Sequence, residues 1–130
     1  MEWNIRPDRP VYLQLVEQLE LAVVTGEYPP GAKVLPVREL AAQAGVNPNT
    51  MQKALAALEA KGLVATHRTA GRTITEDETM LHALREEMAL GQARAFCAAM
   101  GKLGLTPREI KALIEQCEKE GTDHGGNAEM

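Results

Sequence analysis

Residues 36–64 constrain the fold of this chain more than any other segment, because they combine two short amphipathic helices with a tight turn. The first helix is predicted to run from about Pro36 to Ala44. It should end at Gly45, which can adopt the positive φ common after a helix C-terminus. The second helix should begin at Asn47-Pro48, a favoured cap followed by a favoured first residue. This pattern predicts a helix-turn-helix.

The second helix has one apolar stripe, so its polar residues are expected on the opposite face. The stripe consists of Met51, Ala54, Leu55 and Leu58. The residues left on the outer face near the helix start are Asn49, Thr50, Gln52 and Lys53. In a helix-turn-helix this part of the second helix contacts the base edges of DNA. The simpler alternative is a face that only meets solvent.

A short β-hairpin is predicted directly after the second helix. Residues 63–67 and 72–75 are β-prone and flank a turn that contains Gly71. Arg68 and Arg72 bracket the tip of this hairpin. The sequence therefore predicts a basic wing that could touch the DNA backbone or the minor groove. Upstream, residues 33–35 could add a short edge strand.

Helices are also predicted on both sides of this motif. The upstream helix has one apolar face, made of Tyr12, Leu15, Val16, Leu19, Ala22 and Val23. Downstream, Gly104 separates a long helix over residues 77–103 from a last helix that opens with the capping box Thr106-Pro107-Arg108-Glu109. The expected fold class is mainly α with a small β-wing: an N-terminal winged helix-turn-helix followed by a two-helix C-terminal unit.

The expected domains are a DNA-binding domain over residues 1–75, a two-helix dimerisation and effector region over 76–120, and a disordered tail over 121–130. The apolar side of the long helix needs a partner, which is either the last helix or a second copy of the chain. The residues expected to carry dimerisation are Leu81, Leu84, Met88, Phe96, Met100, Ile110, Leu113 and Ile114.

The net charge of −4 conceals an uneven distribution of charged residues. Residues 33–75 hold six Lys or Arg against two Glu, a balance of +4. Residues 76–130 hold six Lys or Arg against eleven Asp or Glu, a balance of −5. A local basic block is what phosphate contact requires, whatever the overall charge.

Several other classes of function lack a sequence signal. The three histidines are not grouped with other ligands, so neither a metal nor a cofactor is expected. Cys97 and Cys117 are expected to be small core residues in a reducing cell. Glu86 and Glu87 are adjacent on a helix and therefore diverge, so no catalytic carboxylate pair and no enzyme activity are expected. No signal sequence or membrane span is evident, which predicts a cytoplasmic protein without membrane contact.

Four segments, in this order and spacing, resemble the GntR family of bacterial transcription regulators: residues 10–14, 26–31, 36–41 and 45–50. The short C-terminal region and the segment Arg68-Thr69-Ala70-Gly71-Arg72 resemble the YtrA-type subfamily. Two positions depart from the pattern. Many relatives have Leu-Pro-Ser-Val-Arg where this chain has Val34-Leu35-Pro36-Val37-Arg38, so the Ser that would cap the first helix is absent. Many relatives also have basic residues where this chain has Gln52.

The resemblance implies a set of DNA contacts and a mode of regulation. The implied contacts are Arg38, Asn47, Asn49, Thr50, Gln52, Lys53, Arg68, Gly71 and Arg72. For Arg38 the alternative is a surface ion pair with a neighbouring acid, and for Asn47 it is a helix cap alone. Subfamily members form homodimers through their C-terminal helices and often control operons that encode ABC transporters.

The sequence thus predicts a dimeric regulator that binds a pseudo-palindromic operator in double-stranded DNA, and the family resemblance implies that it is a repressor. One alternative is a winged-helix module for protein–protein assembly, which would expose apolar residues on the outer face of the second helix. Another is a regulator that senses a small-molecule effector in a pocket at the C-terminal helices. This second alternative is compatible with DNA binding.

Overall fold

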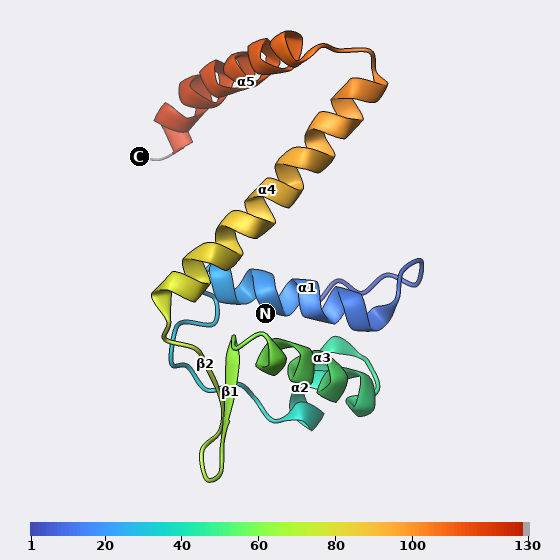
Figure 1. Ribbon diagram of the computed structural model, residues 1–130, viewed down its shortest axis with the longest axis vertical. Coiled ribbons are helices and arrows are strands. Elements are labelled where there is room, and N and C mark those ends of the chain that lie inside the picture. Colours follow the sequence, from blue (N-terminus) through green and yellow to red (C-terminus); the bar gives the residue numbers. More distant parts are fainter. Residues whose placement is uncertain (129–130) are drawn as a thin grey trace. The chain divides into compact units, whose positions relative to one another are not determined.

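The computed structural model describes the backbone of residues 1–128 and the side chains of residues 1–121. The described residues form five helices and one two-stranded antiparallel sheet (Figure 1). In chain order the elements are α1 (Val11–Val24), α2 (Val37–Ala44), α3 (Pro48–Ala60), β1 (Val64–His67), β2 (Gly71–Ile74), α4 (Glu78–Lys102) and α5 (Pro107–Ala128). The predicted fold class, mainly helical with a small β-wing, is confirmed. The chain divides into two compact units, residues 1–86 and 87–130.

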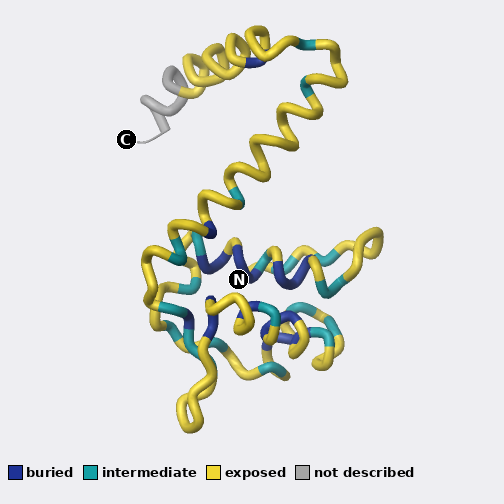
Figure 2. The backbone as a smooth tube through the Cα atoms, in the orientation of Figure 1, coloured by how far each residue is buried: buried dark blue, intermediate teal, exposed yellow. Residues whose placement is uncertain are grey.

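The first unit contains one hydrophobic core, which α1, α2 and α3 share. The largest fully buried side chains are Leu15, Leu19, Leu40, Met51, Leu55, Leu58 and Leu63. Figure 2 shows these buried stretches along the inner sides of the three helices. α3 packs against both α1 and α2, and all four residues of its predicted apolar stripe are buried. Because the core fixes that face of α3, the polar face of the helix must point outward.

The turn between α2 and α3 has the geometry that its sequence predicts. Gly45 has a φ of 71°, in the left-handed region that favours glycine. The Oδ1 of Asn47 accepts a hydrogen bond of 2.7 Å from the backbone N–H of Asn49, which caps α3. At the start of α2, by contrast, Pro36 provides no side-chain cap. The missing serine of the family pattern therefore leaves α2 without one capping hydrogen bond.

The wing is a hairpin extended by a third segment. β1 and β2 pair in antiparallel register, with Val64 opposite Ile74 and His67 opposite Gly71. Lys33 forms an isolated bridge with Thr73, and backbone hydrogen bonds of 2.9 Å join Val34 N–H to the Arg72 carbonyl and Ile74 N–H to the Ala32 carbonyl. The segment before α2 therefore pairs with the wing, as predicted for an edge strand.

The residues before α1 form an N-terminal arm that is fixed to this helix at Asn4 and Arg6 by two glutamine side chains. Gln18 accepts from the backbone N–H of Asn4 and donates to its carbonyl, at 3.0 and 2.7 Å. Gln14 does the same with Arg6, at 2.7 Å in both directions. Because each amide side chain satisfies one backbone donor and one backbone acceptor, the arm is fixed without a partner strand.

The first turns of α4 belong to the N-terminal unit. Leu84 is buried there, and the guanidinium of Arg85 donates a hydrogen bond of 3.1 Å to the carbonyl of Val24. The sequence predicts a domain boundary between residues 75 and 76, and the two compact units meet at residues 86 and 87. The beginning of α4 is therefore part of the unit that carries the helix-turn-helix.

The second unit consists of the rest of α4 and α5. α5 begins with the predicted capping box, in which Thr106 N–H donates to the Glu109 carboxylate at 2.9 Å and Glu109 N–H donates to the Thr106 hydroxyl at 3.2 Å. α5 continues as far as Ala128, past Gly121 where the sequence analysis ended it. Residues 129–130 lie outside the described residues, and the disorder expected of residues 121–130 stays a prediction.

Among the described side chains of the second unit, most apolar ones are exposed in the single chain. Phe96 is 41% exposed, Leu103 72% and Ile114 41%, whereas Ile110 is buried. Cys97 and Cys117 are also exposed, so the expectation that they are core residues is wrong for one chain. Helical periodicity identifies an apolar face but does not say what covers it. Among the described residues, no helix is long and apolar enough to cross a bilayer.

Candidate nucleic-acid interface

The outer face of α3 presents the polar side chains that the sequence analysis selected. Asn49, Gln52 and Lys53 are exposed, and Thr50 is half-buried. They lie opposite the buried stripe of the same helix. The face carries no large exposed hydrophobic residue among those described. It is therefore a polar surface with hydrogen-bond donors and acceptors, of the kind that can pair with base edges.

Asn47 has a structural role that accounts for its side-chain oxygen. That oxygen is the acceptor of the cap hydrogen bond to Asn49 N–H. The residue is nevertheless exposed, and the amide N–H₂ group remains available at the start of α3. Capping explains why Asn occurs at this position, and it leaves room for a contact to a phosphate.

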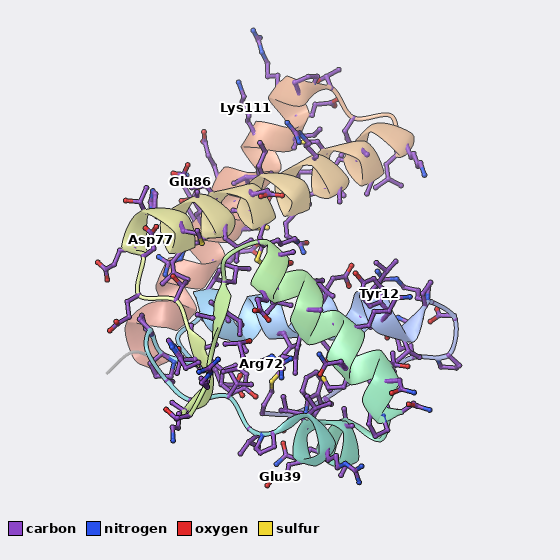
Figure 3. The ribbon with its side chains drawn as sticks, turned by 60° about the horizontal axis from the view of Figure 1, so that its bottom comes forward. Tyr12, Glu39, Arg72, Asp77, Glu86 and Lys111 are labelled. Atoms are coloured by element: carbon purple, nitrogen blue, oxygen red, sulfur yellow. The ribbon has the colours of Figure 1, made fainter. Side chains whose placement is uncertain are left out.

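Lys53 contacts an aromatic ring from another helix. Its ammonium lies 5.3 Å from the centroid of the Tyr12 ring, within the range of a cation–π interaction. Tyr12 lies in the first turn of α1, where Figure 3 labels it. Helical periodicity predicts that Tyr12 lies on the buried face of its helix, but the residue is half-buried. No local pattern connects residues 12 and 53, so this contact was missed.

The wing carries the remaining selected residues. Arg68 is exposed in the turn between β1 and β2, and Gly71 begins β2 with a φ of 76°. Arg72, which Figure 3 labels, lies in β2 and is half-buried. Its Nε has no hydrogen-bond partner within the described part of the chain. The tip therefore combines a glycine turn with two guanidinium groups.

Five basic side chains of this region lack acidic partners among the described residues. Within the described residues, Lys33, Arg38, Lys53, Arg68 and Arg72 form no ion pair. The described ion pairs of basic side chains are Arg6–Asp8, Arg9–Glu17, Lys61–Glu20 and His82–Glu86. The expected alternative for Arg38, an ion pair with a neighbouring acid, is thus not observed in the described residues. Five uncompensated cations are available to phosphates.

The residues selected for dimerisation divide between the two units. Leu84 belongs to the first unit and is buried, while Leu81 is half-buried there. In the second unit, Ile110 is buried and Met88 and Met100 are half-buried, whereas Phe96, Leu113 and Ile114 are exposed. Of the residues selected for dimerisation, Phe96, Leu113 and Ile114 are therefore the most accessible to a second copy.

Comparison with known proteins identifies this arrangement. Residues 11–74 match the model of the gntR family of bacterial regulatory proteins. The chain is also 34% identical over 121 residues to the HTH-type transcriptional regulator YhcF of Bacillus subtilis, a match that covers 93% of this chain and 100% of YhcF. The chain belongs to the gntR family. It is accordingly a DNA-binding transcription regulator and not an enzyme.

Two further similarities support this family assignment. The HTH-type transcriptional repressor YtrA of Bacillus subtilis is 39% identical over 72 residues, which cover 55% of each chain. A solved GntR family transcriptional regulator from Listeria monocytogenes is 36% identical, with a TM-score of 0.80 over 86% of this chain and 98% of that one. The resemblance to GntR and YtrA that the sequence suggested is thereby confirmed.

Proposed function

We propose that this regulator is a repressor that binds a pseudo-palindromic operator as a homodimer and blocks access of RNA polymerase to a promoter. The observation that carries the proposal is the exposed polar start of α3, accompanied by cations without acidic partners on α2 and the wing. The similarity to YtrA, which is named a repressor, supports repression. The family assignment supports action in the cytoplasm, where bacterial DNA lies.

Each selected residue has a contact that suits its chemistry. The amides of Asn49 and Gln52 can each pair with adenine, and Lys53 can pair with guanine. Arg38 can hold a base or a phosphate with two parallel hydrogen bonds. Thr50 is small enough to let the DNA backbone approach.

The wing contributes contacts of a different kind. Because Gly71 has no side chain at the tip, that part of the hairpin can approach the minor groove closely. Arg68 and Arg72 would then contact the phosphates on either side, and Asn47 would contact a phosphate at the start of α3. These contacts would fix the register of the protein on DNA, while the residues of α3 would distinguish one base pair from another.

The proposed dimer uses the exposed apolar side chains of the second unit. Phe96, Leu113 and Ile114 are about 40% exposed in the single chain, and a second copy would cover them. A two-fold dimer predicts half-sites about one helical turn, roughly 34 Å, apart. Phe96→Ala should shift the dimer toward monomer in analytical ultracentrifugation, whereas Arg94→Ala on the same helix should not. An unchanged dimer in Phe96→Ala would contradict this role for the helix.

The decisive experiment is selection of genomic DNA fragments by the purified protein, followed by affinity measurements at several salt concentrations. A recovered palindrome upstream of the regulator's own operon would support the proposal. The YtrA-type resemblance leads us to expect genes for an ABC transporter there. Weak, salt-dependent binding to every fragment would instead favour the assembly module, although the polar outer face of α3 argues against a protein partner.

A small-molecule effector remains a prediction that a thermal-shift screen can test. One alternative raised by the sequence is such a pocket at the C-terminal helices. The structure has a hollow of about 320 Å³ in the N-terminal unit, between the end of α1 and the start of α4. His82 and Arg85 are among its lining residues. Stabilisation by a ligand that Arg85→Ala abolishes would assign the effector to this hollow.

A further inference from the structure

The two lysines of the recognition region are restrained in different ways. At the end of α3, Lys61 forms an ion pair of 2.5 Å with Glu20, so its charge is compensated within the protein. Near the start of α3, Lys53 has no carboxylate within 4.0 Å among the described residues and lies instead over the ring of Tyr12. An aromatic face attracts an ammonium without neutralising it. Lys53 is thus held in place while its full charge and its N–H donors stay available.

Tyr12 is itself well placed to act as a support. It lies in the first turn of α1 and is half-buried, and a tyrosine side chain has only two χ angles. α1 packs against α3 through a shared core that includes Leu15 and Leu55. The ring therefore has a defined position relative to the outer face of α3.

Restraint matters at this position because lysine is a poor reader of bases when it is free. Its four-carbon stem samples many rotamers, and its ammonium acts as a point charge that any nearby phosphate can attract. A side chain held in its bound position before association loses less entropy when it binds. Such a side chain can also favour one base edge over the surrounding phosphates.

We propose that Tyr12 is a positioning residue that directs Lys53 to one base pair of the operator. This inference rests on the proposed operator binding and adds the residue that gives one position of the operator its specificity. Tyr12 acts through Lys53, so its effect should disappear when Lys53 is absent. Lys53 reads guanine, because the O6 and N7 atoms of guanine are the acceptors that lysine recognises in the major groove.

The test compares Tyr12→Leu, Tyr12→Phe and Lys53→Met, alone and combined, on the operator recovered from the genomic selection. Fluorescence anisotropy measures the affinity for that operator and for variants with each base pair of a half-site changed. Tyr12→Leu should weaken operator binding about two- to fivefold, the equivalent of an exposed cation–π interaction. It should also reduce discrimination at one base pair, the same one that Lys53→Met affects.

Two results separate positioning from general stabilisation. Tyr12→Phe keeps the ring and should behave like the wild type, and Tyr12→Leu should have no further effect in the Lys53→Met background. Tyr28→Leu makes the same substitution in the turn after α1, where no cation lies on the ring among the described residues, and should leave discrimination unchanged.

Other outcomes would overturn the inference. Tighter binding by Tyr12→Leu would mean that the ring competes with DNA for the ammonium. An equal loss on every sequence, or the same loss with and without Lys53, would mean that Tyr12 only stabilises the fold. These outcomes leave operator binding by the wild type intact. Failure of the wild type to select any DNA sequence would instead overturn the proposed function itself, and the inference with it.

Discussion

The ion pair between Glu20 and Lys61 allows a quantitative prediction about how α1 is fixed to α3. The carboxylate of Glu20 lies on α1 and is only 10% exposed, whereas the ammonium of Lys61 is 54% exposed. Lys61→Met removes the cation, keeps the aliphatic stem and leaves a nearly buried carboxylate without its partner. Breaking a fully buried pair costs about 3–5 kcal/mol, and exposed pairs contribute below about 1 kcal/mol. Since only one member is buried here, we expect a loss of about 2 kcal/mol.

This loss is large enough to measure by thermal and urea unfolding. For a unit of 86 residues, each kcal/mol lowers Tm by about 4–8 °C, so Lys61→Met should melt roughly 8–16 °C below the wild type. Protein concentration must be equal in all samples, because a dimer makes Tm depend on it. Lys33→Met is the matched control, since Lys33 is exposed in the same unit and has no ion pair within the described residues. Its effect should stay within about 0.5 kcal/mol.

The reasoning fails if Lys61→Met and Lys33→Met unfold at the same temperature and urea concentration. A second variant tests the coupling directly. Glu20→Gln combined with Lys61→Met leaves a neutral amide in place of the orphaned carboxylate, so the double variant should be more stable than Lys61→Met alone. Losses that simply add would show that the two side chains are not coupled.

Three further predictions concern the cap, the wing and the first helix. Asn47→Ala should destabilise the chain by about 1 kcal/mol through loss of the α3 cap, whereas Asn47→Asp should not; urea unfolding checks both. Gly71→Ala meets no atom within 4 Å, so its cost should be backbone strain alone, about 1–2 kcal/mol, again measured in urea. The pKa of Glu17 is lowered mainly by its hydrogen bond from Arg9. The stability that this pair adds is therefore present above about pH 4 and lost as pH falls through the lowered pKa. The difference in Tm between wild type and Arg9→Gln should shrink over that window, and a difference that persists at pH 2 would contradict this cause.

The parts of the fold that could be predicted from the sequence are those with local causes. The Asn47 cap, the left-handed Gly45 and the reciprocal hydrogen bonds of Thr106 and Glu109 each involve residues within three positions of one another. Helical periodicity likewise placed Met51 and its neighbours inside and Lys53 outside. These signals determine where helices begin, where they end and which face is buried.

The contacts that the sequence did not predict join residues far apart in the chain. Tyr12 and Lys53 lie on different helices, as do Glu20 and Lys61. Their side chains meet because the core brings α1 and α3 together, and no periodic pattern encodes that pairing. In the same way, only tertiary packing shows that Leu84 is covered by the N-terminal unit, which extends to residue 86.

The distribution of charge explains how an acidic chain can serve as a DNA reader. With a net charge of −4, the protein as a whole is not attracted to DNA at long range. At physiological salt, however, charges separated by more than about 8 Å are largely screened, so binding depends on the cations that reach the phosphates directly. Arg38 on α2, Lys53 near the start of α3, and Arg68 and Arg72 on the wing have no acidic partner among the described residues. Non-specific affinity for DNA grows with the number of phosphates that the protein neutralises. The net negative charge of this chain contributes little to that non-specific affinity. Affinity for an operator must then come chiefly from a few positioned groups, which is why the restraint on a single lysine can matter for specificity.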